Sequence, residues 1–130
     1  AAAGLTATMR NGSEAGEDMI RRTTPKTCET VPAIGLGTRR AFDVGAPNDG
    51  HRACLDLLFE AGGGIIDASP IYGLAEGVVG GLLTGKEERY PAFIATKVWT
   101  ECRYQGIAQM EESLRRFQRG SIDLSCRLTT

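Results

Sequence analysis

The sequence predicts an α/β fold built on a parallel sheet. Short apolar segments alternate with segments whose apolar residues recur at helical spacing, which is typical of strands joined by crossover helices. The apolar segments are short and continuous, as expected for strands that are covered on both faces. The 17 glycines concentrate between these segments and mark turns. An open doubly wound sheet and a (β/α)8 barrel both remain compatible with this order.

A β-hairpin is expected first, with strands over 19–24 and 29–31. Strands are then expected over 33–37, 65–67 and 93–97, and a fourth strand begins at 122–124. Three helices alternate with these four strands, and Gly62 and Gly85 end the first two. The predicted apolar stripes of the helices are Cys54, Leu55, Leu58 and Phe59 in the first, Ala75, Val78, Val79, Leu82 and Leu83 in the second, and Ile107, Met110, Leu114 and Phe117 in the third.

The first eighteen residues differ in composition from the rest and are expected to be a disordered leader, or the remnant of an export signal or an added tag. The net charge of −1 gives no electrostatic reason to expect nucleic acid or an anionic membrane as partner. No apolar run is long enough to span a bilayer. We therefore expect a cytoplasmic protein, with export as the alternative if Ala1–Ala7 is the end of a signal peptide.

The four cysteines, Cys28, Cys54, Cys102 and Cys126, are widely and irregularly spaced. They form no paired metal-binding motif, and the lone His51 adds no second ligand, so no metal site is expected. The expectation is reduced and mostly buried thiols. His51 follows a turn at a predicted helix start and is expected at the surface.

Three residues suggest proton transfer to a carbonyl group. Asp67 and Lys97 each end an apolar strand, and Tyr72 lies on the loop just after Asp67. Functional residues collect at the carboxyl ends of parallel strands. A free phenol has a pKa near 10, and a neighbouring lysine lowers the pKa of a phenol while a carboxylate keeps the lysine charged and oriented. Each residue alone also has a plain structural interpretation, as a packing tyrosine, a turn aspartate or a solvated strand-end lysine.

Longer motifs around these residues resemble the aldo-keto reductase family. They are Gly35-Leu-Gly37-Thr38, then Ile66-Asp67-Ala-Ser-Pro-Ile-Tyr72-Gly73-x-x-Glu76-x-x-x-Gly80, then Ile94-Ala-Thr-Lys97-Val-Trp99, and finally Met110-Glu-x-Ser113-Leu114-Arg-Arg116 with Ile122-Asp123-Leu124. The resemblance runs from about Met19 to Leu124. Gly35-Leu-Gly37-Thr-Arg-Arg40 lacks the third glycine of a dinucleotide-binding loop, and no helix follows it at once, so a Rossmann fold is not favoured.

The resemblance implies the N-terminal half of a (β/α)8 barrel over 19–130, with about four parallel strands and three helices after the hairpin. It implies an NADPH-dependent oxidoreductase that reduces aldehydes or ketones to alcohols. Tyr72 would be the general acid, assisted by Lys97 and Asp67. Gly37, Thr38, Arg39 and Asp67 would contact the cofactor, although the family more often has an aromatic residue at the position of Arg39. Trp99 would line the substrate pocket beside Tyr72.

The sequence departs from the family near its end. The family usually carries a histidine four residues after the Asp-Leu pair, and Leu128 stands at that position here. A frameshift or an early stop near Ser125 would explain this departure, and sequencing the downstream reading frame tests it. An open half-barrel would expose an apolar inner face and two strand edges. The alternative function is therefore an inactive half-barrel that binds another chain, with self-association through those edges.

Overall fold

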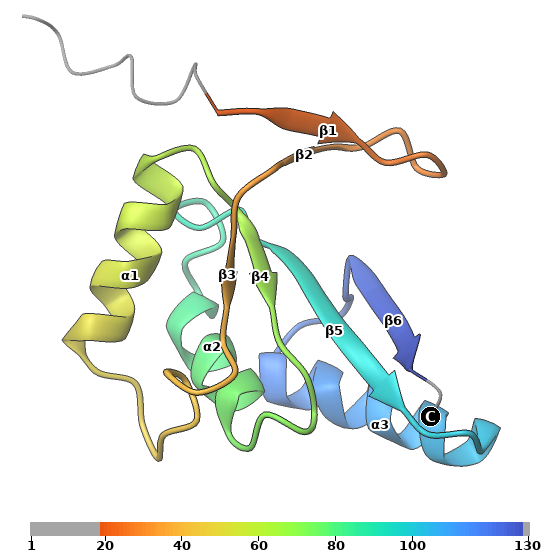
Figure 1. Cartoon of the computed structure of the whole chain (residues 1–130). Helices are drawn as coiled ribbons and strands as arrows, with labels where there is room; N and C mark the ends of the chain where they lie inside the picture. The colour runs from red at the N-terminus through yellow and green to blue at the C-terminus, as the bar shows by residue number, and fades with distance from the viewer. Residues whose placement is uncertain (1–18, 129–130) are drawn as a thin grey trace, which may run out of the picture.

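The computed structural model describes residues 19–128, which form two sheets and three helices (Figure 1). The expected leader over 1–18 lies outside the described residues. A two-stranded antiparallel sheet joins β1 (Arg21–Thr23) to β2 (Thr30–Pro32), with Arg21 opposite Pro32. The hairpin expected from the sequence is thus confirmed.

The main sheet contains four parallel strands, namely β3 (Gly35–Gly37), β4 (Ile65–Asp67), β5 (Phe93–Trp99) and β6 (Leu124–Leu128). Their order in the sheet is the same as their order along the chain. A doubly wound sheet reverses direction at a switch point, whereas a barrel adds each new strand to the same edge. The topology therefore favours the barrel over the open sheet.

The helices are α1 (Asp49–Glu60), α2 (Ala75–Leu83) and α3 (Arg103–Phe117), each of which connects two neighbouring strands. Right-handed crossovers in a constant direction place all three on one face of the sheet, as Figure 1 shows. The main core lies between this face and the helices. It contains Phe42, Leu55, Ile66, Ala68, Ala75, Val78, Val79, Leu82, Leu83, Tyr90, Ala92, Ile94 and Phe117.

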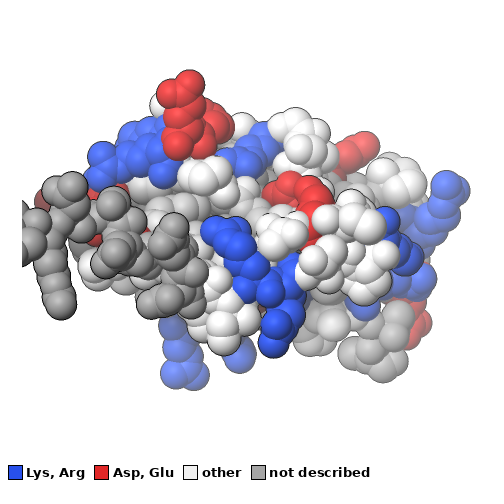
Figure 2. All heavy atoms as spheres, turned by 90° about the horizontal axis from the view of Figure 1, so that it is seen from above, with Lys and Arg blue, Asp and Glu red and all other residues white. Residues whose placement is uncertain are grey.

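The hairpin lies at the amino ends of the main strands, above them in Figure 1. Basic and acidic side chains are interspersed on this face of the molecule (Figure 2), in keeping with the net charge of −1. Within residues 19–128, no helix combines the length and the apolar character needed to cross a bilayer.

His51 is buried, and the expected surface position is wrong. It is the third residue of α1, where its backbone N–H donates to Asn48 Oδ1 at 3.2 Å and its Nδ1 accepts from the Asn48 N–H at 3.1 Å. The other ring nitrogen, Nε2, lies 2.7 Å from the carbonyl oxygen of Ala41, and the ring packs edge-on against Phe42. A histidine at this position therefore caps the helix and fixes the preceding loop at the same time.

The apolar stripe predicted for α3 is only partly buried. Phe117 is buried, but Ile107 and Met110 are exposed, and the other buried residues are Gly106, which faces β5, and Ser113, which bonds to Glu76 of α2. Small residues allow α3 to approach β5 closely: a Cβ built on Gly106 would lie 3.3 Å from Cγ1 of Val98.

The expectation of mostly buried thiols is also wrong, because all four cysteines are free and exposed. Cys54 lies beside the buried stripe of α1 rather than within it, since that stripe is centred on His51 and Leu55. Cys28 lies in the hairpin turn with a positive φ of 57°, Cys102 is the N-cap residue of α3, and Cys126 lies in the exposed strand β6.

Glu76 joins three elements through one buried carboxylate. It lies on α2 and is fully buried, and its Oε1 accepts hydrogen bonds from Thr96 Oγ1 on β5 at 2.7 Å and from Ser113 Oγ on α3 at 2.9 Å. Its Oε2 lies 3.6 Å from a guanidinium nitrogen of Arg116. A buried charge is tolerated only where it is paired and hydrogen-bonded, so these contacts depend on one another.

We predict that Glu76→Ala lowers the free energy of unfolding by about 2–5 kcal/mol, because it leaves the buried hydroxyls of Thr96 and Ser113 without their acceptor and removes one of the two carboxylates that pair with Arg116. Urea unfolding measures the loss. Glu111→Ala, at an exposed position on α3, is the control and should change stability little. A Glu76→Ala variant as stable as the parent would contradict this assignment.

Asp56 ties α1 to the loop that precedes β5. Its Oδ1 accepts from Tyr90 Oη at 2.5 Å and from the Arg89 guanidinium at 2.7 Å. The hydrogen bond from Tyr90, and then that from Arg89, hold the pKa of Asp56 below its usual value. The same hydrogen bond raises the pKa of Tyr90, with burial of the ring as a second cause.

The lowered pKa predicts how stability depends on pH. Because the folded-state pKa of Asp56 lies below the unfolded value of about 3.9, its contribution is present above that value and is lost as pH falls through the folded-state pKa. Asp56→Asn should therefore be less stable than the parent at neutral pH, and the two should converge below about pH 4. Urea unfolding across this range measures the difference, with Glu60→Gln on the same helix as control. A constant difference down to the lowest pH would refute the prediction.

Candidate functional site

Asp67 and Lys97 lie at the carboxyl ends of adjacent strands. β4 pairs with β5 so that Asp67 is opposite Ala95, which places Lys97 two residues further along the same face. The neighbouring Thr96 points toward α2, where it bonds to Glu76, so Lys97 points to the other face of the sheet. This face would be the interior of a closed barrel.

Lys97 and Asp67 form a direct ion pair. Lys97 Nζ donates to Asp67 Oδ1 at 2.6 Å and to the carbonyl oxygen of Ala68 at 3.0 Å. The lysine side chain is 19% exposed and the aspartate side chain 46%, so the pair lies at the margin between protein and solvent. Two acceptors on one ammonium group restrict the position of that group far more than one acceptor would.

The structure also brings Tyr72 to this pair. Lys97 Nζ lies 5.1 Å from the centroid of the Tyr72 ring, within the range of a cation–π interaction. The ring is half-buried, and the backbone N–H of Tyr72 donates to the carbonyl oxygen of Ser69 at 3.0 Å. The ammonium group is therefore against the face of the ring. Hydrogen bonds used in catalysis are often long in the absence of substrate and tighten when it binds.

Thr38, directly after the adjacent strand β3, supports Asp67. Thr38 is fully buried, and both its backbone N–H and its hydroxyl donate to the Asp67 carbonyl oxygen, at 3.1 Å and 2.9 Å. Its cofactor contact stays a prediction, and the bond to Asp67 already occupies its hydroxyl proton. Gly37 ends β3 with open space where a side chain would begin, and Arg39 is exposed on the loop that follows. Their cofactor contacts likewise stay predictions.

Trp99 ends β5, two residues beyond Lys97, and its side chain is largely exposed. Its backbone is held at both polar groups by Gln109 of α3, whose Oε1 accepts from the Trp99 N–H at 2.9 Å and whose Nε2 donates to the Trp99 carbonyl at 3.1 Å. Gln109 was not among the candidates from the sequence, because an amide on a helix resembles any solvated polar residue.

The position predicted for a family histidine also belongs to this end of the sheet. Leu128 is opposite Trp99 in the parallel register, just as Cys126 is opposite Lys97. A half-buried leucine therefore occupies a position from which a polar side chain would reach the open face beside Lys97. Residues 125–128 do form a strand, but they are not buried as an inner barrel strand would be.

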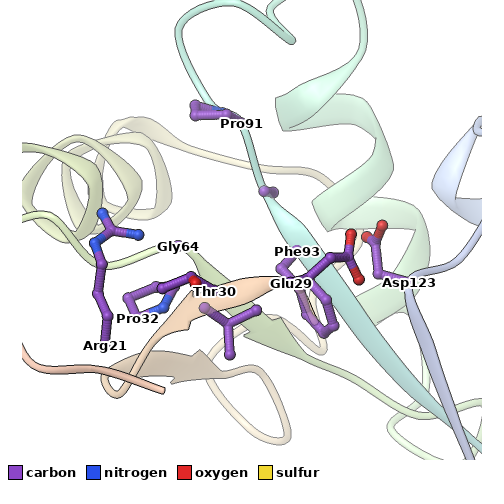
Figure 3. A pocket seen from close by; sticks show the side chains of 11 residues that line it. Arg21, Glu29, Thr30, Pro32, Gly64, Pro91, Phe93 and Asp123 are labelled. Carbon is purple, nitrogen blue, oxygen red and sulfur yellow. The ribbon is translucent and has the colours of Figure 1, made fainter. Parts of the chain in front are cut away.

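A hollow of about 540 Å³ lies at the opposite end of the strands (Figure 3). It is bounded by Arg21, Glu29 and Pro32 from the hairpin, and by Phe93 and Asp123 from the amino ends of β5 and β6. The hollow lies between the hairpin and the amino ends of the main strands, and none of the candidate site residues lines it. The geometry of the ion pair and tyrosine, rather than the size of this hollow, therefore identifies the candidate site.

The chain is similar to one known protein family and to several solved structures. The model of the Aldo/keto reductase family matches residues 33–126. No curated protein sequence matches the chain. A solved structure from Pseudomonas aeruginosa, assigned to the aldo-keto reductases, is 27% identical with a TM-score of 0.74, and the match covers 88% of this chain and 49% of that one.

Two further solved structures contain the cofactor. An aldo-keto reductase of Bombyx mori in complex with NADP is 26% identical, with a TM-score of 0.63 and coverage of 82% of this chain and 37% of that one. An aldo/keto reductase of Klebsiella pneumoniae in complex with NADP and acetate is 30% identical, with a TM-score of 0.61 and coverage of 75% and 35%. The chain thus spans less than half the length of these similar structures. The chain belongs to the aldo/keto reductase family, and its strands and helices have the fold of the N-terminal half of that family's (β/α)8 barrel.

Proposed function

We propose that this chain carries the proton-donating half of a carbonyl reductase site, which reduces aldehydes or ketones to alcohols with NADPH. The observation that supports this best is the joint position of Tyr72, Lys97 and Asp67. The Lys97 ammonium bonds to Asp67 at 2.6 Å and lies 5.1 Å from the Tyr72 ring centroid. A tyrosine beside an oriented cation is suited to give up its proton, because the cation stabilises the phenolate that remains.

In the proposed reaction, the substrate carbonyl carbon accepts a hydride and its oxygen accepts the phenolic proton of Tyr72. Lys97 stabilises the negative charge left on the tyrosine oxygen, and Asp67 together with the Ala68 carbonyl keeps the ammonium group in place. Trp99 provides an aromatic wall on the same face. The alcohol leaves, and a proton from solvent restores the phenol.

The open end of the sheet suits a nicotinamide cofactor, which would supply the hydride. Gly37 presents no side chain there, and a Cβ at this position would meet no atom within 4 Å. A planar ring can therefore approach the strand ends between Gly37 and the partly exposed Asp67. Arg39 is exposed on the adjoining loop and suits a phosphate group. The preference for NADPH comes from the family, and these residues would hold only one side of such a molecule.

We predict that Tyr72→Phe lowers kcat/KM for aldehyde-dependent NADPH oxidation by roughly 10²–10⁴-fold through loss of the acid. The variant keeps the ring that contacts Lys97, so the loss reports on the hydroxyl alone. Tyr104→Phe is the matched control, because that tyrosine is 81% exposed on α3. Loss of NADPH absorbance measures the rate, and equal turnover by the Tyr72→Phe variant would exclude the acid role.

A second candidate function is an interaction module that pairs with a second copy of the chain. Within the described residues, β3 pairs only with β4 and β6 only with β5, so both edges of the main sheet are open. Exposed apolar side chains lie at the β6 edge, namely Ile107 and Met110 on α3 and Leu124 on β6 itself. A second copy fits because four consecutive strands are half of the eight that close such a barrel.

We expect this pairing to appear as a concentration-dependent dimer in sedimentation velocity, and we expect Met110→Lys to shift it toward monomer by placing a charge in the apolar contact. Ile71→Lys is the control, since Ile71 is also apolar and exposed but lies on the loop after β4, an inner strand of the sheet. A monomeric parent chain at every concentration tested would exclude self-association.

A further inference from the structure

The loop that carries Tyr72 is held from outside by one side chain. Asp43, on the loop after β3, accepts a hydrogen bond through Oδ1 from the backbone N–H of Leu74 at 2.9 Å. The same carboxylate lies directly against Gly73, where it occupies the space that a Cβ would need. Asp43 therefore contacts the two residues that follow Tyr72.

This contact satisfies a backbone donor that α2 leaves without a partner of its own. Leu74 is the N-cap residue of α2, and its side chain makes no capping bond. The N–H groups of the first helical turn lack partners within the helix, and a carboxylate is the preferred acceptor at that end. Asp43 thus acts as a cap for α2 that is supplied by a different loop.

The position of Gly73 explains why this cap matters for the tyrosine. Gly73 has a positive φ of 61°, and glycine is the residue with the most backbone freedom. On one side of it, the Tyr72 N–H donates to Ser69 and the Tyr72 carbonyl accepts from Ala75. With Leu74 fixed by Asp43, the chain is held on both sides of Gly73. Without that bond, the backbone on the C-terminal side of Gly73 would be free to move, immediately beside Tyr72.

Asp43 is itself presented by a fixed turn. Its N–H donates to the carbonyl oxygen of Arg40 at 3.3 Å, and the preceding Phe42 is buried in the core. The Phe42 ring packs on His51, and the Nε2 of His51 bonds to the Ala41 carbonyl at 2.7 Å. The buried histidine and the loop after β3 therefore support the position of the Asp43 carboxylate.

We propose that Asp43 is a positioning residue for Tyr72, which acts through Gly73 and Leu74 to keep the phenol beside Lys97. The inference rests on the proposed function, because only that function gives the position of the Tyr72 phenol a role in proton donation. The geometric part can be tested without any turnover, so the two can fail separately.

The test compares Asp43→Ala with Asp43→Asn in the full chain. Asn keeps an Oδ1 that can accept from Leu74, whereas Ala removes the acceptor. Asp43→Ala should speed amide hydrogen exchange at Leu74 by roughly tenfold or more and shift the NMR ring resonances of Tyr72, which Tyr72→Phe assigns. Asp43→Asn should leave both close to the parent. Arg40→Ala, in the same loop, is the control and should change neither.

Activity forms the second arm of the test. If the parent reduces an aldehyde, Asp43→Ala should lower kcat more than it raises KM, and Asp43→Asn should restore most of the loss, which a merely destabilised fold would not do. A parent without turnover defeats the proposed function, while the exchange and ring measurements still decide the role of Asp43. Unchanged Leu74 exchange and Tyr72 resonances in Asp43→Ala, or failure of Asp43→Asn to restore them, would overturn the inference.

Discussion

The arrangement of this half-barrel depends on the buried carboxylate of Glu76. It accepts from Thr96 at 2.7 Å and from Ser113 at 2.9 Å, and it thereby joins α2, β5 and α3 at one point. Thr96 and Lys97 are neighbours whose side chains point to opposite faces of the sheet. The bond that fixes Thr96 against the helices therefore also fixes the strand from which Lys97 extends. A polar interaction in the core thus determines where the charge of the candidate site lies.

The candidate site is assembled by backbone contacts more than by contacts between functional groups. Thr38 donates twice to the Asp67 carbonyl, and Gln109 bonds to both polar backbone groups of Trp99. These bonds fix the strand ends, and the side chains of Asp67, Lys97 and Trp99 then follow from the direction of each strand. The ion pair between Asp67 and Lys97 can be short because its two strands are already held in register.

Most of the fold could be predicted from the sequence because its signals are local. Apolar runs beside glycine indicated β3 and β4, an apolar run ending at Lys97 indicated β5, and an apolar repeat at helical spacing indicated α2. The three residues of the proposed acid site were found because each comes at or just after a strand end, and parallel strands bring such positions together.

The remainder could not be predicted because it depends on contacts between distant segments. A capping role for His51 was not evident, since its burial requires the loop before α1 to fold back over the helix start. The burial of Ser113 in place of Met110 required knowledge of how α3 packs against Glu76 of α2. Asp43 is a polar residue in a loop, and its partner Leu74 lies 31 positions away in the sequence. A single sequence contains no pattern that joins such a pair.

The contacts that support the proposed acid site and those that a hydride donor would need lie in different places. Thr38, Asp43, Glu76 and Gln109 all belong to the loop after β3, to α2 or to α3, so the described residues hold Tyr72, Lys97 and Trp99 without any contribution from beyond β6. In the proposed function, a nicotinamide nucleotide, which is long and highly charged, would meet Gly37, Arg39 and Asp67 on one side only. The supports of the proposed proton donor therefore lie within the described residues, whereas a nicotinamide nucleotide would need contacts beyond these three residues.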